Sequence, residues 1–147
     1  MIKLYTIGFT QKPAEIFFNL LRNSGVKTLV DIRINNVSQL SGFAKGADLE
    51  YFLKEIGNIT YEHNLDFAPT KELLSMYRHN KITWEQYETE YLKLLDMRNI
   101  AQSTDIEKLH ENCFLCSEPT PEQCHRRLLV EYLKRVRNDI EIIHLIK

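Results

Sequence analysis

Two cysteines, a histidine and an arginine lie in one short segment near the end of the sequence. Residues 116 to 126 read Cys-Ser-Glu-Pro-Thr-Pro-Glu-Gln-Cys-His-Arg. A cysteine can supply a thiolate nucleophile or a soft metal ligand, histidine can move a proton, and arginine can pair with carboxylate or phosphate. The segment therefore has three interpretations: a reactive thiol site, a metal site, or a strand-to-helix connection with small buried thiols.

The thiol interpretation centres on Cys124, which follows residues typical of a helix start. Thr120 and Gln123 have the spacing of a capping box, and Pro121 takes the position after the cap. Free amides and the positive dipole end of a helix favour an anion and lower a thiol pKa. We expect the turn at 118–126 to bind an anion with help from Arg126.

The three cysteines are expected to differ in acidity. Cys124 is predicted to have the lowest pKa, because it combines the helix start with neighbouring basic side chains. Cys113 is predicted to be the least reactive, since burial in a strand disfavours its thiolate. Cys116 is expected to lie between them, as a resolving thiol if the two sulfur atoms meet.

A zinc site is the second interpretation, since Cys113 and Cys116 are followed by Cys124 and His125. In a strand, however, side chains three positions apart point to opposite faces, whereas a zinc knuckle needs both thiols on one turn. We therefore expect no metal and no other cofactor. The third interpretation stays open, because free cysteines are often small buried core residues.

The surrounding pattern alternates strands with helices. Strands are predicted over 3–7, 28–33, 59–63, 112–116 and 140–145. Helices are predicted from Pro13 to Gly25, from an Asp48 cap to Gly57, through an inserted helical region at about 70–111 with a Thr83–Gln86 capping box, and from Thr120 onward. Alternation of this kind predicts an α/β fold, with a mostly parallel sheet covered by helices on both faces and the 28–33 strand central.

In such sheets ligands bind beyond the carboxyl ends of the strands. Gly8, Arg33, His63 and Cys116 each end a predicted strand and are expected at this edge. We expect one cleft to be lined by Asp31, Arg33, Cys116, Cys124 and Arg126. In the structural alternative, Asp31 and Arg33 simply pair with each other, His63 and His125 are ordinary structural histidines, and the aromatic residues of the helical region are packing residues.

Composition sets broader limits. The chain has 147 residues, which fits a single domain over 1–147, and its 19 basic and 20 acidic residues give a formal net charge of -1. No global basic field is present for nucleic acid, so an anion site must be local. The N-terminal segment lacks the pattern of a signal peptide or membrane helix, and three cysteines do not suggest a disulfide scaffold. We therefore expect reduced thiols and a cytoplasmic protein that does not bind membranes.

Several segments together resemble the DUF488 family of uncharacterised small prokaryotic proteins. They are YTIGFT at 5–10, LVDIR at 29–33, SGFAK at 41–45, ITYEH at 59–63 and the C-x-E-x-x-P-x-x-C-H-R run at 116–126. The resemblance implies an α/β domain and a site, but no particular reaction. The site residues that it implies are Tyr5, Gly8, Asp31, Arg33, Ser38, Phe43, Cys116, Glu118, Cys124, His125 and Arg126.

The sequence departs from the family pattern at three places. Phe9-Thr10 replaces a histidine followed by serine or threonine, Asn36 replaces a proline, and Gln39 replaces an arginine. Any role that depends on those replaced side chains is not supported here.

Two functions from different classes are compatible with these features. The first is an enzyme acting on a phosphorylated or nucleotide-like substrate, with Cys124 as nucleophile or redox thiol and Arg33 and Arg126 binding the anion. Asp31 or His125 would transfer a proton, Glu118 would hold His125 in one tautomer or cap a turn, and Cys116 would assist. The second is a non-catalytic module that binds a nucleotide or a nucleic-acid end; the oligomeric state is not predicted.

Overall fold

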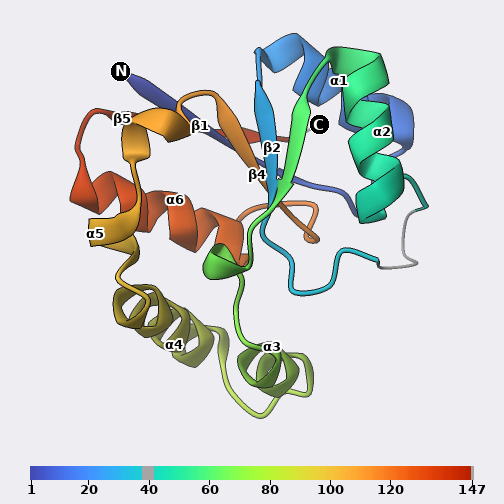
Figure 1. The fold of residues 1–147 in the computed structure, drawn as a ribbon. Helices are drawn as coiled ribbons and strands as arrows, with labels where there is room; N and C mark the ends of the chain where they lie inside the picture. Colours follow the sequence, from blue (N-terminus) through green and yellow to red (C-terminus); the bar gives the residue numbers. More distant parts are fainter. Residues whose placement is uncertain (38–41, 147) are drawn as a thin grey trace.

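The protein is built on a five-stranded parallel sheet. A computed structural model describes residues 1–37 and 42–146. The strands are β1 (Ile2–Gly8), β2 (Thr28–Asp31), β3 (Thr60–His63), β4 (Asn112–Cys116) and β5 (Ile140–Leu145), in the order β3-β2-β4-β1-β5. Every pairing between neighbouring strands is parallel (Figure 1). The predicted α/β class is confirmed.

Helices pack against both faces of the sheet. On one face α1 (Ala14–Ser24) and α2 (Gly46–Gly57) bury Phe17, Leu21 and Leu53 with the sheet residues Ile7 and Leu29. On the other face lie α4 (Trp84–Met97), α5 (Ile100–Ser103) and α6 (His125–Val136) (Figure 1). Each strand contributes side chains to the apolar clusters on both faces of the sheet, because successive side chains point to opposite faces. In β4, Cys113 belongs to the first layer and Cys116 to the second.

The predicted strand 28–33 is an interior strand, but β4 takes the middle position of the sheet. Leu29 and Val30 are fully buried. The strand ends at Asp31, two residues earlier than predicted. The backbone N–H of Ile32 still bonds the Leu115 carbonyl at 3.1 Å, and the Asp31 carboxylate then accepts the backbone N–H of Arg33 at 3.2 Å.

Some helix boundaries follow their sequence signals. Pro13 is the N-cap of α1, and Gly25 ends that helix with a left-handed φ of 90°, which glycine adopts without strain. Thr83 and Gln86 form the predicted capping box of α4.

Two other predicted caps are wrong. Helix α2 begins at Gly46, so Asp48 lies in its first turn rather than at its cap; the helix ends at Gly57 as predicted, with Asn58 in the left-handed position after it. Helix α6 begins at His125 with Cys124 as its N-cap, so Thr120 caps no helix. The Gln123 side chain, which a capping box would need, accepts a hydrogen bond from the Tyr77 hydroxyl at 3.2 Å instead.

The predicted helical insertion is confirmed between β3 and β4. It contains α3 (Lys71–Arg78), α4 and α5, with short 3-10 helices at Leu65–Phe67 and Ile106–Leu109; another 3-10 helix, Gly42–Ala44, precedes α2. Helix α3 lies beyond the end of the sheet (Figure 1). Within the described ranges, no helix is both long and apolar enough to cross a bilayer.

Candidate functional site

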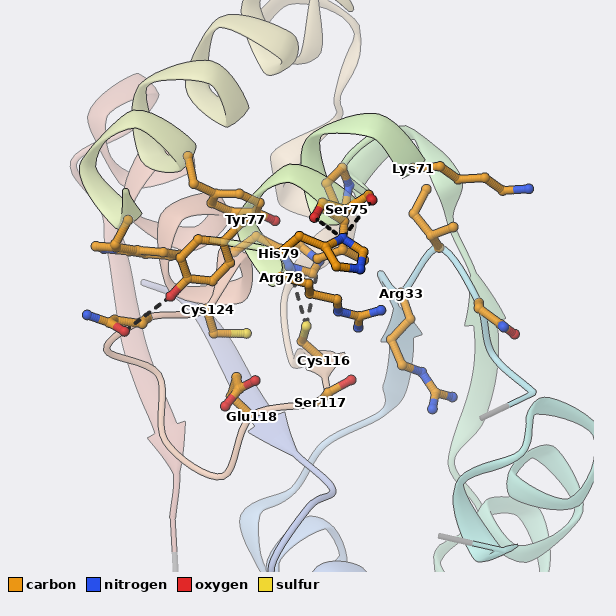
Figure 2. A pocket seen from close by; sticks show the side chains of 18 of the residues that line it. Arg33, Lys71, Ser75, Tyr77, Arg78, His79, Cys116, Ser117, Glu118 and Cys124 are labelled. Atoms are coloured by element: carbon orange, nitrogen blue, oxygen red, sulfur yellow. Dashed lines mark hydrogen bonds between the residues drawn. The ribbon is translucent and has the colours of Figure 1, made fainter. Parts of the chain in front are cut away.

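A pocket of about 710 Å³ opens between α3, the carboxyl ends of β2 and β4, and the loop that follows β4 (Figure 2). Cys116, Cys124 and His125 are buried and line its inner part. The outer part is lined by α3 side chains, among them Lys71 and Arg78. Pockets of this size hold substrates as large as a nucleotide.

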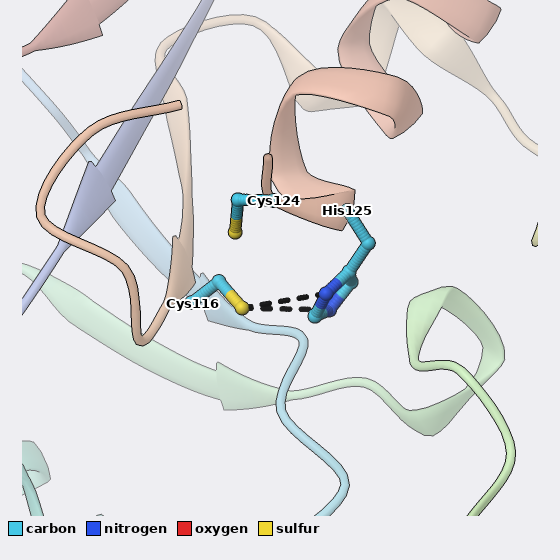
Figure 3. Close-up of side chains that lie close together, drawn as sticks. All are labelled: Cys116, Cys124 and His125. Atoms are coloured by element: carbon cyan, nitrogen blue, oxygen red, sulfur yellow. Dashed lines mark hydrogen bonds between the residues drawn. The ribbon is translucent and has the colours of Figure 1, made fainter. Parts of the chain in front are cut away.

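Cys116 and His125 form a close pair in this pocket. Cys116 is the last residue of β4, and His125 is the first residue of α6. The Cys116 Sγ lies 3.4 Å from Nδ1 of His125 and 3.7 Å from its Nε2 (Figure 3). A strand end and a helix start thus bring a thiol and an imidazole into hydrogen-bond contact.

The tautomer of His125 follows from its second contact. Its Nε2 lies 2.9 Å from the carbonyl oxygen of Ile32, and a carbonyl can only accept, so Nε2 carries the proton. Burial lowers the pKa of His125, which keeps the ring neutral. Nδ1, the ring nitrogen nearer to Cys116 Sγ, is therefore the unprotonated nitrogen.

Burial raises the pKa of the Cys116 thiol, but four other influences outweigh it and the net pKa lies below the ordinary value. These are the Cys124 thiol, the backbone N–H of Ser117 and the positive charges of Arg126 and Arg33. The pKa of Cys124 is raised well above the ordinary value, first by burial and then by the neighbouring Cys116. Two close thiols cannot both carry a negative charge, and these directions favour Cys116, opposite to the expectation that Cys124 has the lowest pKa.

Cys113 lies on the opposite face of the sheet, and burial raises its pKa far above the ordinary value. Cys113 is the thiol that we predict to be the least reactive, and it does not line the pocket. This separation supports the expectation that Cys113 and Cys116 do not share a metal.

Arg126 is a fully buried cation behind the two thiols. Its Nη1 donates to the carbonyl of Glu118 at 2.7 Å and to the Sγ of Cys124 at 3.5 Å, and its Nε has no acceptor. Among the described residues, no carboxylate lies within 4.0 Å of it. A buried cation without a carboxylate favours a thiolate nearby. Arg126 does not line the pocket, so its predicted direct contact with substrate is not supported.

Asp31 and Arg33 pair with each other, as in the structural alternative. Arg33 donates from Nε and Nη2 to the two Asp31 oxygens at 2.8 Å and 2.7 Å, and also to the carbonyl of Ala44. The Tyr61 hydroxyl donates to Asp31 at 2.7 Å. Asp31 is fully buried and does not line the pocket, whereas Arg33 does. The single cleft predicted for five residues thus contains Arg33, Cys116 and Cys124, with Asp31 and Arg126 behind its wall.

Other predicted site residues lie outside the pocket. The Tyr5 hydroxyl donates to the Ser24 carbonyl, and Phe43 packs against aromatic rings of α1, both on the opposite side of the sheet. His63 contacts the Arg33 carbonyl at 2.7 Å through Nε2 and does not line the pocket. Ser38 lies outside the described residues.

Gly8 and Glu118 shape the loop that follows β4. The Glu118 carbonyl lies directly against the Cα of Gly8, where a β-carbon would overlap it. The Glu118 side chain lines the pocket and is exposed, but Ile32, rather than Glu118, fixes the tautomer of His125. Thr10 ties the same loop down by donating from its backbone and its hydroxyl to the Ser117 carbonyl.

Cys116, Cys124 and His125 could also hold a metal ion. One ligand atom from each lies within 4.8 Å of the other two, and all three side chains are buried. Two thiols and an imidazole with one open position suit zinc chemically. The sequence argument against zinc concerned only Cys113 and Cys116, and it does not apply to this set. Arg126 next to Cys124 already supplies positive charge for a thiolate, and this favours the metal-free thiol interpretation.

Sequence reasoning missed the basic side chains that α3 brings to the pocket. Lys71, Arg78 and His79 line it, and Figure 2 shows Arg78 between the helix and Cys116. Helical spacing showed only an amphipathic segment, and no motif indicated where it would pack. Lys12 was also missed: it is buried, it donates to the Gly8 carbonyl at 2.8 Å, and burial together with Arg126 lowers its pKa.

A scan against family models matches the chain over residues 13–133 to the domain of unknown function DUF488. This range contains β2, the helical insertion and the whole Cys-His-Arg segment, whereas β1 and β5 lie entirely outside it. Comparison with curated proteins and with solved structures finds no match. The chain therefore belongs to the DUF488 family.

Proposed function

We propose that this protein is a cysteine-dependent enzyme that acts on a phosphorylated or nucleotide-like substrate. Cys116 is the nucleophile and His125 is the general base. The observation that carries the proposal is the 3.4 Å contact between Cys116 Sγ and the unprotonated Nδ1 of His125. The backbone carbonyl of Ile32 orients the imidazole, and this completes the nucleophile, base and orienting group found in thiol enzymes.

The roles of the two pocket cysteines differ from those that the sequence predicts. Cys116 carries the favourable pKa shift and the contact with the base, whereas Cys124 stabilises its thiolate from the helix N-cap. Arg126 supports the charge from behind. Asp31 is committed to Arg33 and Tyr61, so His125 is the group that moves the proton.

The reaction follows from these positions. His125 Nδ1 takes the proton of the Cys116 thiol, and Sγ attacks the phosphorus atom of the substrate. The bond from phosphorus to the leaving oxygen breaks, and that oxygen receives the proton from His125. Water, deprotonated by the same imidazole, then displaces the sulfur, which releases phosphate and restores the thiol.

The charges of the pocket support an anionic substrate. Arg78 and Lys71 line the wall, and no carboxylate lies within 4.0 Å of either in the part of the chain that the structure describes. Glu118 is the acidic side chain of the lining, and it is exposed. The start of α6 adds the positive end of its dipole beside the thiols. The anion is thus expected between α3 and the 117–124 loop.

The first test compares two alkylating agents of similar size, neutral iodoacetamide and anionic iodoacetate. The ratio of the alkylation rate with iodoacetate to the rate with iodoacetamide should be higher for Cys116 than for a free thiol. Arg78→Gln should lower that ratio by about threefold or more, because one nearby positive charge contributes on the order of 1 kcal/mol. Lys81→Gln is the matched control, since Lys81 is exposed and does not line the pocket.

The second test is turnover of a phosphate monoester and of nucleotides. Hydrolysis should be lost in Cys116→Ser and kept in Cys113→Ala. If nucleotides protect Cys116 from alkylation without turnover, the protein is a binding module. If it purifies with one zinc ion per chain, lost in Cys116→Ser and Cys124→Ser, the site is a metal centre and the thiol mechanism is wrong.

The proposal also includes a setting. A mechanism that uses a free thiol requires a reducing compartment, so we place the protein in the cytoplasm, and we treat the chain as one domain. All three cysteines are free in the structure, which is compatible with this location.

A further inference from the structure

The pocket contains a second thiol that the proposed reaction does not consume. Cys124 and Cys116 place their sulfur atoms within 4.8 Å of each other, and both side chains line the same cavity (Figure 3). They come from different elements, the end of β4 and the N-cap of α6. The third cysteine, Cys113, lies across the sheet.

We propose that Cys116 and Cys124 form a redox-active dithiol that reduces a hydroperoxide and closes to a disulfide. This activity is separate from the transfer reaction, and it uses a small oxidant that fits the pocket in place of the anionic substrate. Cys116 is the attacking thiol, because it contacts the proton acceptor His125. Cys124 is the resolving thiol, because its sulfur is the one close enough to reach Cys116.

The two steps balance as follows. The Cys116 thiolate attacks the terminal oxygen of a hydroperoxide; the O–O bond breaks, the alkoxide or hydroxide leaves with a proton, and Cys116 becomes a sulfenic acid. Cys124 Sγ then attacks the sulfenic sulfur, the S–O bond breaks, and hydroxide leaves as water with the Cys124 proton. Two electrons pass from the two thiols to the peroxide, and an added dithiol reduces the disulfide again.

The surroundings favour both steps. The Nη1 group of Arg126 donates to Cys124 Sγ at 3.5 Å, which stabilises negative charge on the resolving sulfur as it attacks. A disulfide needs a sulfur separation of about 2.05 Å, so the two atoms must approach further. Residues 117–123 between the two thiols contain no helix or strand. Ser117 and Glu118 are held by Thr10 and Gly8, so the approach depends on residues 119–123, which can adjust without unfolding α6 or the sheet.

The experiment treats the reduced full chain with one equivalent of hydrogen peroxide and maps the cysteines by mass spectrometry. We expect the intact mass to fall by about 2 Da through loss of two hydrogens, with one disulfide linking 116 to 124. In Cys124→Ser the oxidation should stop at the sulfenic acid, and dimedone should label Cys116. Cys113→Ala is the matched control and should form the same disulfide as the unchanged protein.

Three results would overturn the inference: Cys116 oxidised to sulfinic acid while Cys124 stays a thiol, a disulfide that includes Cys113, or links only between chains. Iodoacetamide labelling of reduced Cys124→Ser, before any peroxide is added, separates this inference from the proposed function. If Cys116 alkylates rapidly there but the unchanged protein forms no 116–124 disulfide, the dithiol inference fails and the thiol nucleophile remains. If the disulfide forms but phosphate esters are not turned over, the opposite holds.

Discussion

The backbone of Glu118 occupies the space that a side chain on Gly8 would need. An ideal β-carbon at residue 8 would overlap the Glu118 carbonyl oxygen, which also accepts a hydrogen bond from the buried Arg126 at 2.7 Å. The end of β1 therefore fixes the loop that positions both pocket thiols. Glycine is required here for close approach of two backbones rather than for an unusual φ.

Gly8→Ala should lower the free energy of unfolding by about 3 kcal/mol, the upper end for overpacking, because a backbone atom must move. Denaturant unfolding measures this effect. Gly42→Ala is the control, since no atom of the described residues lies within 4 Å of a β-carbon built there, and it should change stability by only about 0.5 kcal/mol. Equal effects at the two positions would contradict the contact.

The rate of cysteine alkylation should depend on pH in an order set by the pocket. The pKa of Cys116 is lowered, so its thiolate persists to lower pH than that of an ordinary thiol, while the pKa values of Cys124 and Cys113 are raised. Iodoacetamide labelling of the folded chain near neutral pH should follow the order Cys116, then Cys124, then Cys113. If Cys124 were labelled fastest, the negative charge shared by Cys116 and Cys124 would reside on the Cys124 sulfur.

Replacing Arg126 should raise the pKa of Cys116. Arg126→Met keeps most of the buried volume and removes the charge, so the rate of Cys116 alkylation at neutral pH should fall about tenfold, equivalent to about one pKa unit. At strongly alkaline pH the variant and the unchanged protein should react at similar rates, since both are then ionised. A rate loss that persists at alkaline pH would indicate blocked access instead.

The Asp31–Arg33 pair should matter for stability. Asp31→Asn leaves a buried guanidinium without its carboxylate and should lower the free energy of unfolding by about 3–5 kcal/mol. Tyr61→Phe removes one hydrogen bond to the same carboxylate and should lower it by about 1 kcal/mol. Chemical denaturation of both variants tests the ranking, and a milder effect for Asp31→Asn would show that Arg33 finds another partner.

Burial and the bond to Asp31 raise the pKa of Tyr61 well above its ordinary value. The Tyr61 hydroxyl should therefore stay protonated at alkaline pH values at which exposed tyrosines ionise. Ultraviolet titration of the folded chain and of Tyr61→Phe tests this. Over the pH range in which exposed tyrosines ionise, the two proteins should show the same change in absorbance. A loss in that range would place the hydroxyl in solvent.

The strands of the sheet are predicted well because the spacing of the apolar residues and the turn residues that bound each run indicate the same limits. The predicted runs 112–116 and 140–145 match the bounds of β4, which is fully buried, and of β5, which is a half-buried edge strand. Helix starts are harder to predict from the sequence, since the side chains of a cap can make tertiary contacts instead. Gln123 of the Thr120 motif accepts a hydrogen bond from Tyr77, whereas Gln86 of the Thr83 motif completes its capping box.

The sequence indicates the thiol segment but not the order of its thiols. The roles that we propose for Cys116 and Cys124 depend on Ile32, whose backbone carbonyl accepts the proton of His125 Nε2. No side-chain pattern reveals a carbonyl, so this contact could not be read from residue types. The basic side chains that α3 contributes to the pocket could not be predicted either, because their position depends on where the helix packs and not on the sequence of the helix.

The strand order has a consequence for how the chain folds during synthesis. β4 lies between β1 and β2, which do not pair with each other, so residues 112–116 must arrive before the N-terminal strands can join into one sheet. A ribosome that has made only the first hundred or so residues therefore holds the paired strands β2 and β3 and a β1 strand without its partners, all with open edges. Cys116 is the last residue of β4, so the thiol that we propose as the nucleophile is made together with the strand that joins the two parts of the sheet.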